Sequence, residues 1–243
     1  MSIKKVKIIR NMYTFILSSF VYNLLLSFMY IDSKDINTLI INIYSNIDLL
    51  YLDDIRKIML WIFPQLIIVR YFGNFFEENL LNNTTVIFTR TNNRSYFLLK
   101  NIFSLFINLL IFCIVQVICI IIVSIINKIQ INIDLSSLLI VCRINLYYFL
   151  MLLIVNGLSV LWKSINVVYV VMLLKMSMMY LSGMLLEYYN LIIRYLPTNI
   201  GIIFNGNLNT CINNIEAIAY CLLYILLFLI LILFLFRKKE FLN

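Results

Sequence analysis

The chain has 243 residues, of which 63% are apolar and 12% are charged, and its formal net charge is +8. A soluble domain of this size needs a polar surface and is usually about 25% charged, so this composition excludes a soluble globular protein and predicts one surrounded by lipid. Histidine is absent, which removes the most common general base and metal ligand, and the five cysteines lack the C-x-x-C spacing of a zinc site. We therefore expect a single all-α membrane domain over residues 1–243, with no cofactor bound to this chain.

Six apolar segments are long enough to cross the roughly 30 Å hydrocarbon core of a bilayer as helices. They run over Met12–Ile31, Ile58–Phe75, Ile102–Ile126, Leu138–Leu161, Val167–Leu186 and Ile215–Phe236. Their continuous apolar character argues against a β-barrel, whose strands alternate between apolar and polar residues. The sequence thus predicts a polytopic protein with six transmembrane helices and both termini on one side of the membrane.

The distribution of lysine and arginine orients these six spans. The side that holds both termini carries the larger group, which comprises Lys4, Lys5, Lys7, Arg10, Arg70, Arg90, Arg94, Lys100, Lys163, Arg237, Lys238 and Lys239. The opposite side carries Lys34, Arg56, Lys57, Lys128 and Arg194. By the positive-inside rule both termini are cytoplasmic, and the abundant Ile, Asn and Lys suggest the plasma membrane of a bacterium with an AT-rich genome. The positive charge then reflects membrane orientation, and we expect no nucleic-acid partner.

The first outer loop, residues 32–54, contains apolar residues at helical spacing. These are Ile36, Leu39, Ile40, Ile43, Ile47 and Leu50. With Asp35 as its N-cap, this stretch predicts a short helix lying in the outer interface. Two interpretations are open: a connector with one apolar face, or a lip that meets substrate or lipid.

The long cytoplasmic loop between the second and third spans predicts a helix, a turn and a second helix. Residues 75–81 suit a short amphipathic helix, and Thr91, Asn92 and Asn93 favour a turn. Asn93 or Ser95 would cap a new helix that continues through Lys100 into the third span. The arginines around the turn serve either to anchor lipid headgroups or to form a docking surface for a cytoplasmic partner.

The segment between the fifth and sixth spans, residues 187–214, is interrupted at Leu196-Pro197-Thr198. It is too short to cross the membrane and return, so we expect two short outer half-helices around Pro197. Irregular backbone at membrane depth must be covered by protein or face water, and this segment is therefore a candidate cap for an outward-facing cavity.

Two basic residues, Lys175 and Arg143, lie inside predicted spans. A central lysine costs about 3 kcal/mol on insertion scales, which nearly cancels the gain from the apolar residues of its span, so Lys175 is expected to face neighbouring helices. Arg143 lies nearer the outer edge, where its side chain can snorkel. Because Glu187 and Glu216 are the nearest acids and lie at the outer boundary, Lys175 either pairs with another subunit, a lipid phosphate or an anionic substrate group, or it snorkels or stays neutral.

Several kinds of chemistry are missing from the sequence. There is no phosphate-binding loop for ATP, no histidine for a serine protease, and no pair of intramembrane aspartates. Internal repeats and midplane carboxylates, which are typical of secondary transporters, are not evident either. We therefore do not expect an enzyme.

The layout resembles the permease subunits of ABC-2-type transporters. The local pattern of Glu77-Glu78, then Thr89 to Arg94, then Lys100, together with the basic stop at residues 236–241, is similar to that family. Within it, the small size is most similar to permeases of peptide-antibiotic export or immunity systems of Firmicutes.

The resemblance implies a subunit that couples export to a separate ATPase carrying ATP and magnesium. The ATPase would dock at Glu77, Glu78, Arg90, Thr91 and Arg94. A second permease chain, identical or related, would complete a path for a bacteriocin-like peptide or lipid-like cargo, and we assign Lys175, Arg143 and Glu187 to that path. The alternative is a non-transporting immunity or sensor-anchoring membrane protein, which membrane lipids alone would surround.

Overall fold

Long apolar runs become long helices because a backbone inside hydrocarbon can satisfy its hydrogen bonds only within a helix or a closed barrel. The computed structural model describes residues 3–44, 55–79, 94–202 and 213–238, and this part of the chain is helical and contains no strand. The helices are α1 (Ile3–Met29), α2 (Ile36–Tyr44), α3 (Ile55–Phe72), α5 (Arg94–Ile126), α6 (Leu135–Ser159), α7 (Ser164–Arg194) and α8 (Asn214–Lys238). A further short helical stretch covers residues 75–79.

Five helices in the described residues are long and apolar enough to cross a membrane, and they belong to α3, α5, α6, α7 and α8. The apolar part of α1, Tyr13–Met29, is shorter. The prediction of an all-helical membrane protein is thereby confirmed, and each of the six predicted segments coincides with a helix over most of its length. A sixth crossing by α1 stays a prediction.

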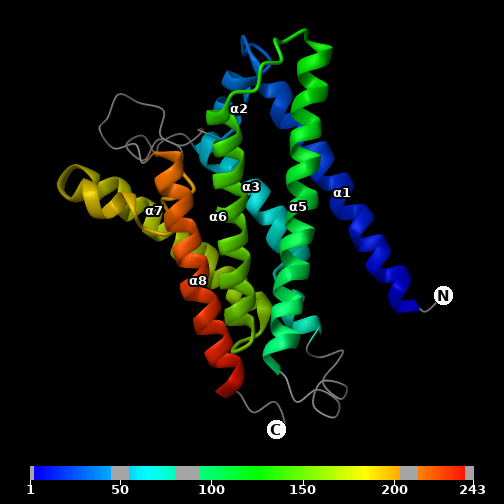
Figure 1. Cartoon of the computed structure of the whole chain (residues 1–243), viewed down its shortest axis with the longest axis vertical. Helices are drawn as coiled ribbons and strands as arrows, with labels where there is room; N and C mark the ends of the chain where they lie inside the picture. Colours follow the sequence, from blue (N-terminus) through cyan, green and yellow to red (C-terminus); the bar gives the residue numbers. More distant parts are fainter. Residues whose placement is uncertain (1–2, 45–54, 80–93, 203–212, 239–243) are drawn as a thin grey trace.

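Successive long helices run in alternating directions along the bundle (Figure 1). We call the end that holds α2 the upper end and the end that holds the α6–α7 connection the lower end, as Figure 1 is drawn. The start of α1 and the end of α8 both lie toward the lower end, and α7 leans out of the bundle as it rises.

Helix α6 occupies the centre of the bundle and contacts α2, α3, α5, α7 and α8. Of its most apolar 18-residue stretch, 67% is buried, against 17% for α8. Gly157 permits the close approach of α8, because a Cβ at this position would lie 2.6 Å from Cγ1 of Ile232. The side chains of α6 therefore determine what the interior of the bundle contains.

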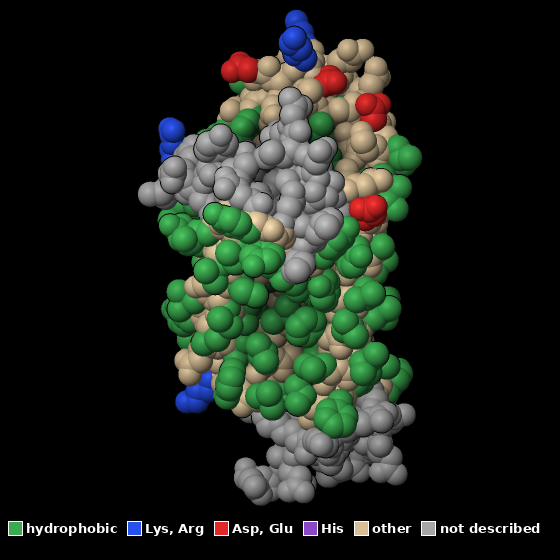
Figure 2. Space-filling view, turned by 90° about the vertical axis from the view of Figure 1, so that its left-hand side faces the viewer, with side chains coloured by type: hydrophobic (Ala, Val, Ile, Leu, Met, Phe, Trp, Pro, Cys, Tyr) green, Lys and Arg blue, Asp and Glu red, His purple; other side chains and the backbone are tan. Residues whose placement is uncertain are grey.

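One face of the molecule carries a wide band of apolar side chains, with charged side chains above it and one basic side chain at its lower edge (Figure 2). Exposed apolar residues include Leu173, Ile230 and Phe103, each at least 65% exposed. A soluble monomer rarely exposes an apolar patch of this extent, and such a band suits contact with the hydrocarbon of a membrane.

Helix α2 begins where the sequence predicted. The backbone N–H of Thr38 donates to Oδ1 of Asp35 at 2.9 Å, which confirms Asp35 as the N-cap. This bond and the one from the Thr38 hydroxyl hold the pKa of the Asp35 carboxyl below its ordinary value. Ile36 and Leu39 are buried against the bundle, so the described apolar face of α2 closes the upper end, as the interpretation of a connector with one apolar face predicts. Ile47 and Leu50 lie outside the described residues.

The segment after α7 differs from the expected half-helices. Helix α7 continues to Arg194, with one non-helical residue at Tyr189 (φ −127°, ψ 38°). Residues 195–202 then form consecutive turns, and Ile200 and Ile202 are buried. The helix ends before Pro197, as predicted. The residues after the proline do not form a second half-helix but turn into the bundle, where the side chains of Ile200 and Ile202 are buried.

Pro64 lies inside α3, where it lacks the N–H that would bond the carbonyl of Leu60. The hydroxyl of Tyr22, on α1, donates to this carbonyl at 2.7 Å. An orphaned backbone group in hydrocarbon is costly, so the tyrosine both satisfies the carbonyl and joins α1 to α3.

We expect Tyr22→Phe to lower the free energy of unfolding by about 1–2 kcal/mol in detergent, because the Leu60 carbonyl loses its donor. In a Pro64→Ala background the restored N–H supplies that bond, and the same change should cost less than half as much. Denaturant unfolding followed by circular dichroism measures both costs, with the exposed Tyr13→Phe as the control. Equal costs in the two backgrounds would contradict this account.

Candidate functional site: buried cations and the turn segment 195–202

Lys175 lies in the interior of the bundle with only 3% of its side chain exposed, as the sequence predicted. Its ammonium donates a hydrogen bond to Oε1 of Gln65 on α3. Gln65 is held in this orientation because its amide nitrogen donates to the carbonyl of Trp61 at 3.0 Å. The lysine therefore points inward and does not snorkel to either membrane surface.

Two aromatic rings complete the surroundings of this ammonium. The Nζ atom of Lys175 lies 3.9 Å from the ring centroid of Trp61 and 4.9 Å from that of Tyr147. Aromatic faces attract a cation most strongly where water is excluded. No described carboxylate forms a salt bridge with Lys175, so Gln65 and these two rings are the partners of its amino group among the described residues. We call Lys175, Gln65, Trp61 and Tyr147 the lysine cage.

Arg143 lies in the first half of α6, and only 2% of it is exposed. The expectation that its side chain snorkels to the membrane surface is therefore wrong. Its Nε and Nη2 atoms donate to the carbonyls of Ile200 and Ile202, each at 2.7 Å, and Nη1 donates to Oδ1 of Asn214 at 3.0 Å. Neither of these carbonyls accepts a backbone hydrogen bond from a described residue. The planar guanidinium group donates to both carbonyls at once. If the side chain extended to the membrane surface instead, both carbonyls would lose this donor.

Tyr147 connects the lysine cage to the turn segment 195–202. A Cβ at Gly201 would lie 2.4 Å from the Tyr147 ring, so only glycine lets the backbone pack against it. Asn199, which is fully buried, donates to the Ser182 hydroxyl at 2.8 Å and to the Ile193 carbonyl at 2.9 Å. The upper part of α7, the turn segment and α6 thus form one packed unit around the two cations.

At the lower end a second polar cluster joins the end of α3 to α6. A continuous helix would bond the N–H of Phe76 to the carbonyl of Phe72, but the chain breaks at Gly73 and Asn74. The side-chain amide of Asn156 bridges this break: its Nδ2 donates to the Phe72 carbonyl at 2.8 Å and its Oδ1 accepts from the Phe76 N–H at 3.0 Å.

Glu77 and Glu78, which we predicted to dock a partner, lie in the short helix 75–79. Oε2 of Glu77 accepts the backbone N–H of Ser164 at 2.9 Å, which places a negative charge at the start of α7. Glu78 is exposed, and its Oε1 accepts from the Asn74 amide at 2.7 Å. Glu77 therefore links this short helix to α7.

The remaining predicted residues are only partly described. Arg90 and Thr91 lie outside the described residues. Arg94 is the first residue of α5, which runs without interruption through Lys100 as predicted, and Glu187 lies in α7; the side chains of Arg94 and Glu187 are not described. The structure thus brings Lys175 and Arg143 to adjoining positions around Tyr147 and leaves their relation to Glu187 open.

Sequence reasoning missed Gln65, Trp61, Tyr147 and Asn156. Gln65 and Asn156 each lie in an apolar run, and Gln65 follows Pro64 directly, whereas Tyr147 is followed by Tyr148 and Phe149 and does not stand out from them. Because no predicted span contains an acid deep in the membrane, the sequence indicated that some other polar group must contact Lys175. Among the described residues, no group of three potential ligands that could hold a metal ion is present.

A scan against models of known protein families gives no match for this chain, and comparisons with curated proteins and with solved structures give none either.

Arg143→Lys should lower the free energy of unfolding by at least about 2 kcal/mol, because one ammonium cannot bond both carbonyls of the turn segment. Denaturant unfolding in detergent measures this loss. Arg70→Lys is the matched control, since Arg70 is exposed and we expect its replacement to change little. A cost no larger than that of the control would show that the fork geometry is unimportant.

Lys175→Met should leave the free energy of unfolding unchanged or higher, because buried charges are often replaced by apolar groups without loss. Trp61→Leu should lower the free energy of unfolding. This loss should be about 1–2 kcal/mol smaller when residue 175 is Met, because a neutral thioether makes no cation–π contact with the ring. A double-mutant cycle measures this coupling, with the exposed Trp162→Leu as the control. A Trp61→Leu cost independent of residue 175 would refute the cation–π contact.

Proposed function

We propose that this chain is the membrane-spanning permease subunit of an ATP-driven exporter in a bacterial plasma membrane. All six long helices cross the bilayer, both termini are cytoplasmic, and the lower end faces the cytoplasm. ATP and magnesium bind to a separate ATPase subunit, and a second permease chain completes the path. The cargo is a bacteriocin-like peptide or a lipid-like molecule.

The observation that carries this proposal is the pair of links made by residues 73–79. This segment leads into the loop expected to bind the ATPase, and it is bound to α6 through Asn156 and to the start of α7 through Glu77. A displacement of the loop would therefore be transmitted to both helices.

The same links suggest how the movement reaches the membrane interior. Helix α7 is joined to α3 at the lysine cage and, through the turn segment 195–202, to Arg143 on α6. If the ATPase pulls the start of α7 away from α3, Lys175 leaves its cage and its ammonium becomes available to the cargo. A cargo bearing a carboxylate or a phosphate would replace the lost aromatic contacts.

Arg90→Glu together with Arg94→Glu tests the docking role. If a phosphate-loop ATPase is encoded beside its gene, the wild-type chain expressed with that ATPase should co-purify with it in a fixed ratio. The reversed charges should reduce the bound ATPase at least ten-fold, because two favourable contacts become repulsive. Quantitative mass spectrometry of the purified complex measures the ratio.

Lys34→Glu provides the matched control, because Lys34 is an exposed cation at the upper end. It should leave the ATPase ratio unchanged. Full protection of cells against the cargo by this chain without any ATPase would refute export and favour the non-transporting immunity protein. Equal loss of ATPase in the control would refute the assigned docking loop.

A further inference from the structure

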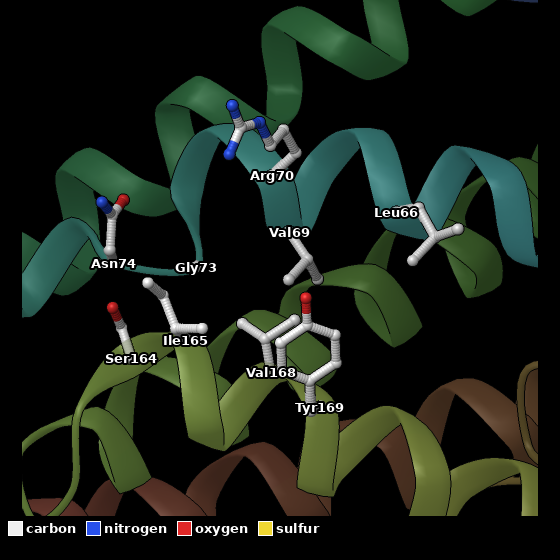
Figure 3. A pocket seen from close by; sticks show the side chains of 9 residues that line it. All are labelled: Leu66, Val69, Arg70, Gly73, Asn74, Ser164, Ile165, Val168 and Tyr169. Carbon is white, nitrogen blue, oxygen red and sulfur yellow. The ribbon is translucent and has the colours of Figure 1, made fainter.

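Two hollows between the helices differ in whether their polar groups already have partners. The larger, of about 360 Å³, lies between α3 and α7 (Figure 3). The amide of Asn74 in its lining donates to Glu78, and the backbone N–H of Ser164 donates to Glu77. The side chain of Arg70 extends from α3 on the side away from α7. The groups of this pocket that would select a charged ligand are therefore bonded within the protein or directed elsewhere.

The smaller hollow is a cavity of about 10 Å³ in the interior of the bundle. Residues of α1, α2, α3, α5 and α6 line it, and Trp61 of the lysine cage is one of them. Its volume is about the smallest that holds one water molecule. Most of the lining is apolar or aromatic, but Tyr44, the last residue of α2, and Gln116 of α5 also contribute to it.

Tyr44 and Gln116 each bring a buried polar atom to this lining that has no hydrogen-bond partner among the described residues. These atoms are the hydroxyl oxygen of Tyr44 and Oε1 of Gln116. The two residues are only 4% and 2% exposed. A polar atom that loses its bonds to solvent on folding destabilises the protein unless another partner replaces them. Two such residues on one cavity therefore point to a ligand that bonds both.

The chemistry of the two atoms suits water. A tyrosine hydroxyl can donate a hydrogen bond, whereas the amide oxygen of glutamine only accepts one, so a single ligand that bonds both must be able to accept and to donate. Buried waters in proteins typically make two to four hydrogen bonds to groups that would otherwise be unsatisfied. Water therefore matches this cavity in size and in bonding.

A metal cation would suit the site less. Both candidate ligands are neutral, and none of the residues that line the cavity is acidic. The amino group of Lys175 lies 3.9 Å from the ring centroid of Trp61, which belongs to the same lining. A cation enclosed here would bring a charge that no neighbouring acid balances, and burying such a charge is costly.

We propose that this cavity binds one water molecule, which accepts a hydrogen bond from the hydroxyl of Tyr44 and donates one to Oε1 of Gln116. The water joins the end of α2 to α5. Helix α2 is then held at the upper end by a polar bridge as well as by its buried apolar face. The proposal holds whether or not the chain exports a cargo.

Tyr44→Phe tests this bridge through the sign of its effect on stability. If the water is bound, the change removes one of its bonds, and the equilibrium constant for unfolding should rise at least roughly five-fold. If the hydroxyl has no partner, the change removes an unpaired buried group, and the constant should stay the same or fall. Denaturant unfolding of the full-length chain in detergent measures the constant, and the second result would overturn the proposal.

Gln116→Met and Ser124→Ala complete this experiment. Tyr44→Phe combined with Gln116→Met should recover most of the lost stability, because no polar group of the pair then needs the water. Ser124 is the matched control, since its hydroxyl is buried in α5 without a described partner but does not line the cavity. Its replacement by alanine should not raise the unfolding constant, and a rise equal to that of Tyr44→Phe would contradict a role for this cavity.

A crystal structure of the full-length chain, resolved well enough to show ordered waters, separates water from the other ways of pairing these atoms. Density should lie within hydrogen-bond distance of both the Tyr44 hydroxyl and Oε1 of Gln116, and it should be absent in the double variant. A direct bond between the two side chains, with no density between them, would overturn the proposal. An anomalous signal at this position after sodium is replaced by rubidium would overturn it in favour of a cation.

Discussion

The structure depends on one constraint: polar groups inside hydrocarbon have no water to bind, so leaving a backbone group without a partner in the protein is costly. The turn segment 195–202 places irregular backbone in the interior, and Arg143 supplies two donors to the carbonyls that those turns free. A cation and an irregular backbone, each expensive alone in this environment, stabilise each other. This pairing explains why Arg143 points inward although the membrane surface is within reach of a long side chain.

The same constraint accounts for two other contacts between helices. Pro64 frees the carbonyl of Leu60, and Tyr22 of α1 bonds it. The break after α3 frees the carbonyl of Phe72 and the N–H of Phe76, and Asn156 of α6 bonds both. In each case an interruption of one helix is repaired by a side chain of another. Interruptions therefore hold the bundle together, because apolar packing alone provides little preference between protein and lipid.

The sequence predicted features that depend on local pattern or on composition. Apolar run length located the helices, spacing and an acidic cap located α2, and the cost of a buried charge indicated that Lys175 faces inward. The partners of Lys175 could not be predicted, because Gln65, Trp61 and Tyr147 come from two other helices whose rotation about their axes is set by packing. The inward orientation of Arg143 was not predicted for a related reason: two of its partners are backbone carbonyls, which no pattern in the sequence identifies.

Helix α7 is the element whose position these contacts control most directly. Glu77 binds its first turn, the lysine cage holds its middle, and Asn199 returns from the turn segment to bond its upper part at Ser182 and Ile193. Between these points its exposed side chains face lipid, which offers little resistance to movement. Glu77 is partly exposed, whereas Lys175 in the lysine cage is buried. Electrostatic contacts are weaker where water is near, so the contact at Glu77 is the weaker of the two. In the proposed exporter, a force applied at residues 73–79 would therefore release α7 from its lower end upward.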